Sequence, residues 1–168
     1  MRQTHRYYLS LGSNIQPETN LAQALEHLGR YGAVEATSRI WESHALGTVG
    51  PNFLNACVSF LATIGRAGLK RDVTTDIETK MGRVRTKNRL APRAIDIDIL
   101  MADNRPLNLQ LWSHPFVVVP MAELLPDFPH PTDHRPLAKL AQEIQARTWI
   151  VARPERLSQS PSPQSKHA

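Results

Sequence analysis

The order of strand-like and helix-like patterns along this chain of 168 residues limits the folds that it can adopt. Four short segments have the alternation or the aromatic and β-branched composition of strands, and two longer ones repeat apolar residues at helical spacing. The strand-like segments are residues 7–11, 34–41, 54–60 and 94–100, and the helical ones are residues 18–30 and 69–81. The predicted order is therefore βαββαβ.

This order predicts an α+β fold of the ferredoxin-like type. In that arrangement an antiparallel sheet carries its helices on one face and leaves the other face open for ligands. A strand at 116–119, a short helix at 121–125 and a helix at 136–147 would form a C-terminal extension. We expect a single domain over residues 1–150. Serine, proline and glutamine then predict a disordered tail over residues 151–168.

Composition narrows the classes of protein to which the chain can belong. Its 41% hydrophobic and 21% charged residues are ordinary for a globular protein, so we expect folding by burial. A single cysteine, Cys57, excludes an internal disulfide and a cysteine-rich zinc site, and it favours a reducing, cytoplasmic environment. Residues 1–14 lack the apolar core of a signal peptide, and Pro120 interrupts the longest apolar run, so no membrane segment is expected.

The predicted strand at residues 94–100 carries two aspartates on one face. Asp96 and Asp98 alternate with isoleucines, which places the two carboxylates on the same side, about 6 to 7 Å apart. Mg²⁺ often takes one or two carboxylates together with phosphate oxygens and water, so this pair can hold a nucleotide-bound metal. The alternative is an edge strand with an acidic solvent face, although aspartate is depleted in strands and like charges repel.

A basic run precedes this strand. Its members are Lys80, Arg83, Arg85, Lys87, Arg89 and Arg93. Arginine outnumbers lysine four to two, which favours bidentate contacts with phosphate oxygens. The run and the net charge of +5 are also compatible with a solvated loop that has some affinity for nucleic acid. The neighbouring carboxylates favour a polyphosphate ligand.

Other candidate residues have two interpretations each. Asn55 lies on the polar face of its predicted strand and can pair with the amide-like edge of a heterocycle or with a neighbouring loop. Phe53 and Phe116 could clamp a flat ring, although aromatic residues in sheet proteins are mostly core. His130 and His134 lack an evident third ligand, so loop structure explains them better than a zinc site does.

With these segments in order, the chain resembles the 6-hydroxymethyl-7,8-dihydropterin pyrophosphokinases of the folate pathway, which move a pyrophosphoryl group from ATP to a pterin alcohol. The resemblance spans roughly residues 7–131 and rests on YLSLGSN, ALG, FLNACV, GRVR and APRAIDIDIL. It implies a ferredoxin-like fold with ATP over the arginine run and two Mg²⁺ ions held by Asp96 and Asp98. The pterin hydroxyl would attack the β-phosphorus and release AMP, through positioning and charge stabilisation.

The resemblance also implies roles for individual residues. The catalytic residues would be Arg83, Arg93, Asp96 and Asp98. The residues that contact the nucleotide or its phosphates would be Glu78, Arg83, Arg85, Arg89, Arg93, Ile99 and His114. The residues that contact the pterin would be Ser43, Leu46, Phe53, Asn55 and Phe116, with the two phenylalanines on either side of the ring.

The chain departs from the family pattern most clearly at two places, besides the minor changes from Thr to Ser43 and Ala94. Leu90 and Ala91 stand where the family commonly has Trp and Gly, and only Pro115 separates His114 from Phe116, where the family has several more residues. A diverged paralogue, which acts on another pterin or binds pterin and nucleotide with little turnover, is the alternative. A nucleic-acid binder would need an RNP-like aromatic motif that this sequence lacks. The expected partners are ATP and a pterin alcohol, with no membrane, no nucleic acid and at most a weak homodimer.

Overall fold

The structure is a computed structural model that describes residues 1–158 apart from residues 48 and 85. Within this part of the chain, seven strands form one sheet with the order β6-β5-β1-β4-β3-β7, and β2 also pairs with β4. The strands are β1 (His5–Ser13), β2 (Ala33–Thr37), β3 (Trp41–Ser43), β4 (Phe53–Ala62), β5 (Asp96–Ala102), β6 (Arg105–Pro106) and β7 (Ile150–Ala152). Every pairing is antiparallel, as predicted.

The helices follow the predicted order. They are α1 (Pro17–Leu28), α2 (Arg66–Gly68), a π-helical segment (Leu69–Thr74), α3 (Thr75–Lys80), a 3-10 turn (Leu109–Ser113), α4 (Pro115–Leu124) and α5 (Leu137–Arg147). The βαββαβ core is confirmed, with the predicted strand at 34–41 divided into β2 and β3. No helix in the described residues is both long and apolar enough to cross a membrane.

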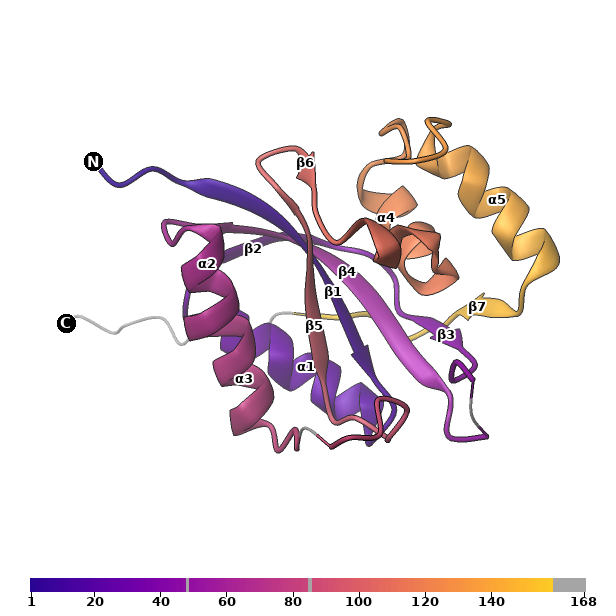
Figure 1. Cartoon of the computed structure of the whole chain (residues 1–168), viewed down its shortest axis with the longest axis horizontal. Helices are drawn as coiled ribbons and strands as arrows, with labels where there is room; N and C mark the ends of the chain where they lie inside the picture. Colours follow the sequence, from indigo (N-terminus) through magenta and orange to yellow (C-terminus); the bar gives the residue numbers. More distant parts are fainter. Residues whose placement is uncertain (48, 85, 159–168) are drawn as a thin grey trace.

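Two hydrophobic cores lie on opposite faces of the sheet (Figure 1). On one face, Leu9 and Ile97 of the sheet pack with residues of α1 and of the α2–α3 helix. On the other face, Tyr8, Cys57 and Met101 pack with residues of α4 and α5. The C-terminal extension therefore covers part of the face opposite α1 and α3, and only the rest of that face is open to ligands.

The strand predicted at residues 116–119 is wrong, because these residues lie in α4. A short apolar run rich in valine is compatible with a buried strand or with a buried helix, and periodicity alone does not separate the two. Pro115 at the first helical position favours the helix, since its fixed φ suits a helix start and its missing N–H needs no partner there. The short helix expected at 121–125 is the second half of α4.

The last described residues are part of the packed structure. Residues 150–152 form β7, a strand that the sequence pattern did not predict. Leu157 is 9% exposed and belongs to the core under α1 and α3. Residues 159–168 of the predicted tail lie outside the described residues.

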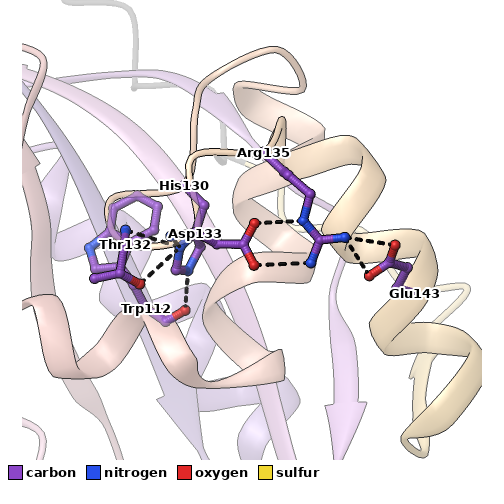
Figure 2. A network of polar contacts seen from close by, with 6 residues as sticks. All are labelled: Trp112, His130, Thr132, Asp133, Arg135 and Glu143. Atoms are coloured by element: carbon purple, nitrogen blue, oxygen red, sulfur yellow. Dashed lines mark hydrogen bonds and ion pairs between the residues drawn. The ribbon is translucent and has the colours of Figure 1, made fainter.

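A polar network fixes the segment between α4 and α5 (Figure 2). The His130 ring donates from Nε2 to the carbonyl oxygen of Trp112 at 2.7 Å, while Nδ1 accepts the backbone N–H of Asp133 at 3.1 Å. These two partners select the Nε2–H tautomer. Arg135 then joins the Asp133 carboxylate to Glu143 of α5. His130 thus organises a loop, which is the role expected for it.

Gly32 precedes β2 where the chain passes close to β4, and it provides a test of this packing. A Cβ atom there would lie 2.2 Å from the carbonyl oxygen of Leu61 and 2.7 Å from the ring of Phe60. We expect Gly32→Ala to destabilise the fold by about 1–3 kcal/mol and to lower Tm by several degrees in thermal unfolding. Gly65→Ala is the control, because no atom lies within 4 Å of its added Cβ. Equal Tm values for the two variants would contradict the packing.

Candidate functional site

A cavity of about 220 Å³ lies on the part of the sheet that α4 and α5 leave open. Its floor is formed by β5, β1 and β4, whose register aligns their polar residues in rows. Gly12 of β1 pairs with Asn55 of β4 and Asp96 of β5, and Ser10 pairs with Asp98 in the next row. Since alternate residues of a strand share a face, the amide and both carboxylates point into the same space.

The cavity walls come from the β3–β4 connection, from α4 and from the arginine run. The wall residues are Ser43, His44, Ala45, Leu46, Phe53, Phe116, Arg89, Leu90, Ala91 and Arg93. All five residues that the sequence suggested for a pterin therefore lie around one cavity, together with Asp96, Asp98, Arg89 and Arg93.

Asn55 is held in place by hydrogen bonds from its own amide group. Nδ2 donates to Ser43 Oγ at 2.9 Å and to the carbonyl oxygen of Trp41 at 3.3 Å. The amide oxygen faces Gly12, where an added Cβ would approach it to 3.3 Å. Glycine at position 12 thus keeps this oxygen accessible to a hydrogen-bond donor on a ligand.

Asp96 is clamped by two arginines. Arg83 Nη1 lies 2.7 Å from one carboxylate oxygen of Asp96, and Arg93 Nη1 lies 2.6 Å from the other. Arg83 Nη1 also lies 2.7 Å from Glu78 Oε2, but without the alignment of a hydrogen bond, so that contact is an ion pair only. Glu78 is 2% exposed and accepts the backbone N–H of Ile97. Glu78 therefore orients Arg83 from behind and does not line the cavity.

Asp98 has a different environment. Among the described residues, none forms an ion pair or hydrogen bond with its carboxylate. Burial raises the pKa of Asp98 to about 6, and the nearby charge of Asp96 adds to this effect. The cavity thus contains one carboxylate neutralised by arginines and one that is costly to ionise.

The two carboxylates fit a divalent cation. Both line the cavity, and the carboxylate of Asp98 has no ion-pair partner among the described residues. In the described part of the chain, no group of three or more His, Cys, Asp and Glu side chains is arranged to hold a metal. The remaining ligands would be oxygen atoms of a bound phosphate or of water, which suits Mg²⁺.

A second hollow, of about 550 Å³, is lined mainly by residues of the arginine run. It shares Arg89, Ala91 and Arg93 with the first cavity, and Arg83 also lines it. The arginines therefore lie between the two spaces, where one extended anion could contact both. Arg85, a further predicted nucleotide contact, lies outside the described residues.

Besides Glu78, two more predicted nucleotide residues do not line the cavity. Ile99 is buried in the core under α1 and α3, on the opposite face from the cavity. The His114 ring stacks on Phe116 with centroids 4.8 Å apart and planes 9° apart. Burial lowers the pKa of His114, so the stacked ring is neutral near pH 7.

Asn14 is a contributor that the sequence interpretation missed. Its backbone N–H and its Oδ1 make a reciprocal pair of hydrogen bonds with the backbone of Arg93, at 3.1 and 2.7 Å. Its Nδ2 also donates to the carbonyl oxygen of Pro51 at 3.4 Å. An asparagine directly after a strand is well suited to bridge neighbouring loops, and this position is the signal that could have identified it.

The fold and the cavity together define a class of protein. The fold is α+β with an antiparallel sheet. On the open face of this sheet, a slot lined by aromatic and amide side chains lies next to paired carboxylates and arginines, and this combination has the features of a phosphoryl-transfer domain. The particular family follows from sequence comparison, in which the family model of 7,8-dihydro-6-hydroxymethylpterin-pyrophosphokinase matches residues 8–126. The chain belongs to this family.

Individual relatives agree with this assignment. The chain is 29% identical over 163 residues to the 2-amino-4-hydroxy-6-hydroxymethyldihydropteridine pyrophosphokinase of Synechocystis sp., with 90% of this chain and 83% of that protein covered. A relative of the same name from Methylorubrum extorquens is 35% identical over 134 residues, with 73% and 84% covered.

A solved structure supports the fold. HPPK-DHPS of Plasmodium falciparum superimposes with a TM-score of 0.64 at 12% identity, over 88% of this chain and 45% of that chain. The present chain thus spans less than half of that protein's length, and the likeness concerns the fold alone.

The raised pKa of Asp98 predicts a pH dependence of stability. The pKa rises from 3.8 to about 6 on folding, so the folded state binds this proton more tightly than the unfolded state does. The resulting stabilisation is present below about pH 4 and is lost as the pH rises through about 6. In Mg²⁺-free urea unfolding, we expect Asp98→Asn to be more stable than the wild type near pH 8 by about 1–3 kcal/mol, and to match it near pH 4.

Asp127→Asn, at an exposed aspartate outside the cavity, is the control and should show no such difference between the two pH values. A pH-independent effect of Asp98→Asn would contradict the buried carboxyl.

Proposed function

We propose that this chain transfers pyrophosphate from ATP to the hydroxymethyl group of 6-hydroxymethyl-7,8-dihydropterin and releases AMP, as a step of folate biosynthesis. One observation carries the proposal. A single cavity joins Phe53, Asn55 and Phe116 to Asp96 and Asp98, in a chain that belongs to the pyrophosphokinase family.

The heterocycle would occupy the slot at the β3–β4 end of the cavity. Phe53 and Phe116 line this slot and can stack on a flat ring, while the accessible oxygen of Asn55 can accept a ring N–H or amino group. Ser43 fixes the Asn55 amide, and Leu46 adds apolar surface at the wall. These groups would contact the two faces of a pterin by stacking and its edge by hydrogen bonding, without any charged contact.

The polyphosphate would lie along Arg83, Arg89 and Arg93, with Asp96 and Asp98 between it and the sheet. Arg83 and Arg93 neutralise Asp96. A bound phosphate can take over these arginine contacts, since guanidinium groups pair equally well with phosphate oxygens. The positive charge needed for the transition state is thus already in place before the nucleotide arrives.

The chain's contribution to the reaction would be positioning. The hydroxymethyl oxygen bonds to the β-phosphorus, its proton passes to solvent, and the bond from that phosphorus to the α,β-bridging oxygen breaks to release AMP. Arg83 and Arg93 hold the charge that develops on the phosphate oxygens. We propose two Mg²⁺ ions at Asp96 and Asp98; bound there, the metal supplies Lewis-acid stabilisation of the phosphate oxygens.

We also place the reaction in the cytoplasm, because it consumes ATP and because a chain with one cysteine cannot form an internal disulfide. The proposed ligands are ATP and the pterin alcohol. We propose that the chain is a monomer or a weak homodimer, and light scattering at several protein concentrations distinguishes these two states.

AMP release is the direct test of the function. With ATP, Mg²⁺ and 6-hydroxymethyl-7,8-dihydropterin, we expect turnover by the wild type and its loss on chelation. Asp98→Asn should lower kcat by about 100-fold or more, because it removes a charge from the metal and phosphate site. Asp103→Asn is the control, since Asp103 pairs with His5 at 2.6 Å outside the cavity. No AMP above background would overturn the function, and tight binding of both ligands without AMP would identify a diverged paralogue.

For His114 we propose a positioning role behind Phe116. His114→Ala removes the ring that stacks on Phe116 and should raise the KM for pterin about three- to tenfold, while the KM for ATP changes less than about twofold. His114→Phe keeps a stacking ring and should restore the pterin KM. A larger rise in the KM for ATP than for pterin would instead assign His114 to the nucleotide.

A further inference from the structure

One wall of the heterocycle slot is a loop. His44, Ala45 and Leu46 line the cavity from the connection between β3 and β4, and Ser43 at the end of β3 holds Asn55. Loop positions are less rigid than strand positions, so a precise binding wall on a loop needs support from the surrounding structure. The C-terminal segment at residues 149–153 provides that support, although it lies beyond the residues that the family model matches.

The first support is a strand pairing. β7 pairs antiparallel with β3, with Ile150 opposite Ser43 and Ala152 opposite Trp41. β3 has only three residues and would be an edge strand without β7. The pairing therefore fixes the backbone of Ser43 at the point where the loop begins.

The second support is a continuous set of side-chain contacts. The indole of Trp149 stacks on the ring of His44, with centroids 4.3 Å apart and planes 14° apart. His44 Nδ1 donates to Asn52 Oδ1 at 3.1 Å, and Asn52 Nδ2 donates to Glu42 Oε1 at 3.0 Å. Arg153 Nη1 donates to Glu42 Oε2 at 3.0 Å. The contacts thus run from one end of β7 through both ends of the loop and back to the other end of β7.

We infer that Trp149 and Arg153, here called the C-terminal clasp, position the β3–β4 loop and thereby set the affinity for the heterocycle and not for the nucleotide. This inference rests on the proposed function for the identity of the heterocycle. Of the two partners of the clasp, His44 lines the slot and Glu42 lies beside it in β3, whereas the arginine run lines the cavity from a separate segment of the chain. Loosening the loop at these two residues should therefore weaken binding of the heterocycle more than binding of the nucleotide.

The clasp residues can be changed without removing core packing. Trp149 is 43% exposed, and the side chain of Arg153 is 31% exposed. Neither belongs to either of the hydrophobic cores on the sheet. We therefore expect folded variants, which a Tm close to that of the wild type verifies.

The test compares three variants of the full chain. Calorimetric titration measures the Kd of 6-hydroxymethyl-7,8-dihydropterin in the presence of Mg²⁺ and a non-hydrolysable ATP analogue, and the Kd of that analogue alone. Trp149→Ala should weaken pterin binding about two- to tenfold, with analogue affinity changed by less than about twofold. Trp149→Phe should restore pterin affinity, and Val151→Ala, at an exposed position of β7, should resemble the wild type. Unchanged pterin affinity, or an equal loss for both ligands, would overturn the clasp.

Hydrogen exchange separates a failure of the clasp from a failure of the proposed function. In Trp149→Ala and Arg153→Gln, the amides that pair β3 with β7 should exchange faster, while those of β1 keep their wild-type protection. This measurement needs no ligand, so it tests the clasp even if the wild type binds no pterin. Absence of pterin binding by the wild type would contradict the proposed function and not the clasp. Unchanged exchange in both variants would overturn the clasp.

Discussion

The antiparallel register of β5, β1 and β4 is the constraint on which the rest of the structure depends. Because side chains alternate along a strand, a single register determines which side chains lie on each of the two faces of the sheet. Leu9, Leu11 and Ile97 reach the core beneath the helices, and Gly12, Asn55 and Asp96 align on the opposite face. A shift by one residue would bury the carboxylates and expose the core, so the same hydrophobic energy that stabilises the sheet also assembles the site.

The charges in the cavity are partly compensated by ion pairs within the chain. Arg83 and Arg93 share Asp96, with the buried Glu78 behind Arg83. Asp98 remains a carboxylate whose pKa is raised to about 6 by burial and by Asp96. A polyphosphate with a divalent cation brings both signs of charge, so it can satisfy the arginines and the carboxylates together. Neither a bare anion nor a bare cation does so alone.

Much of the fold and of the site could be predicted from sequence, and the exceptions have physical causes. Alternation identified the strand with Asp96 and Asp98, and helical spacing identified α1 and α3, since both patterns reflect burial on one face. The run at 116–119 is apolar on every side, so it has no period that separates strand from helix. β7 has three residues, too few for a pattern, and only its pairing with β3 makes it a strand.

The sequence by itself determined the residue chemistry: an Asp-x-Asp strand, an arginine run and the aromatic and amide residues that resemble a pterin pyrophosphokinase. The tertiary structure decided which of them meet. It brought Phe53, Asn55 and Phe116 into one cavity, placed Glu78 and Ile99 outside it, and put Trp149 against His44. The physical reason is that residue type and periodicity are local properties, whereas contacts between distant segments arise only when the sheet register and the packing of α4, α5 and β7 bring them together.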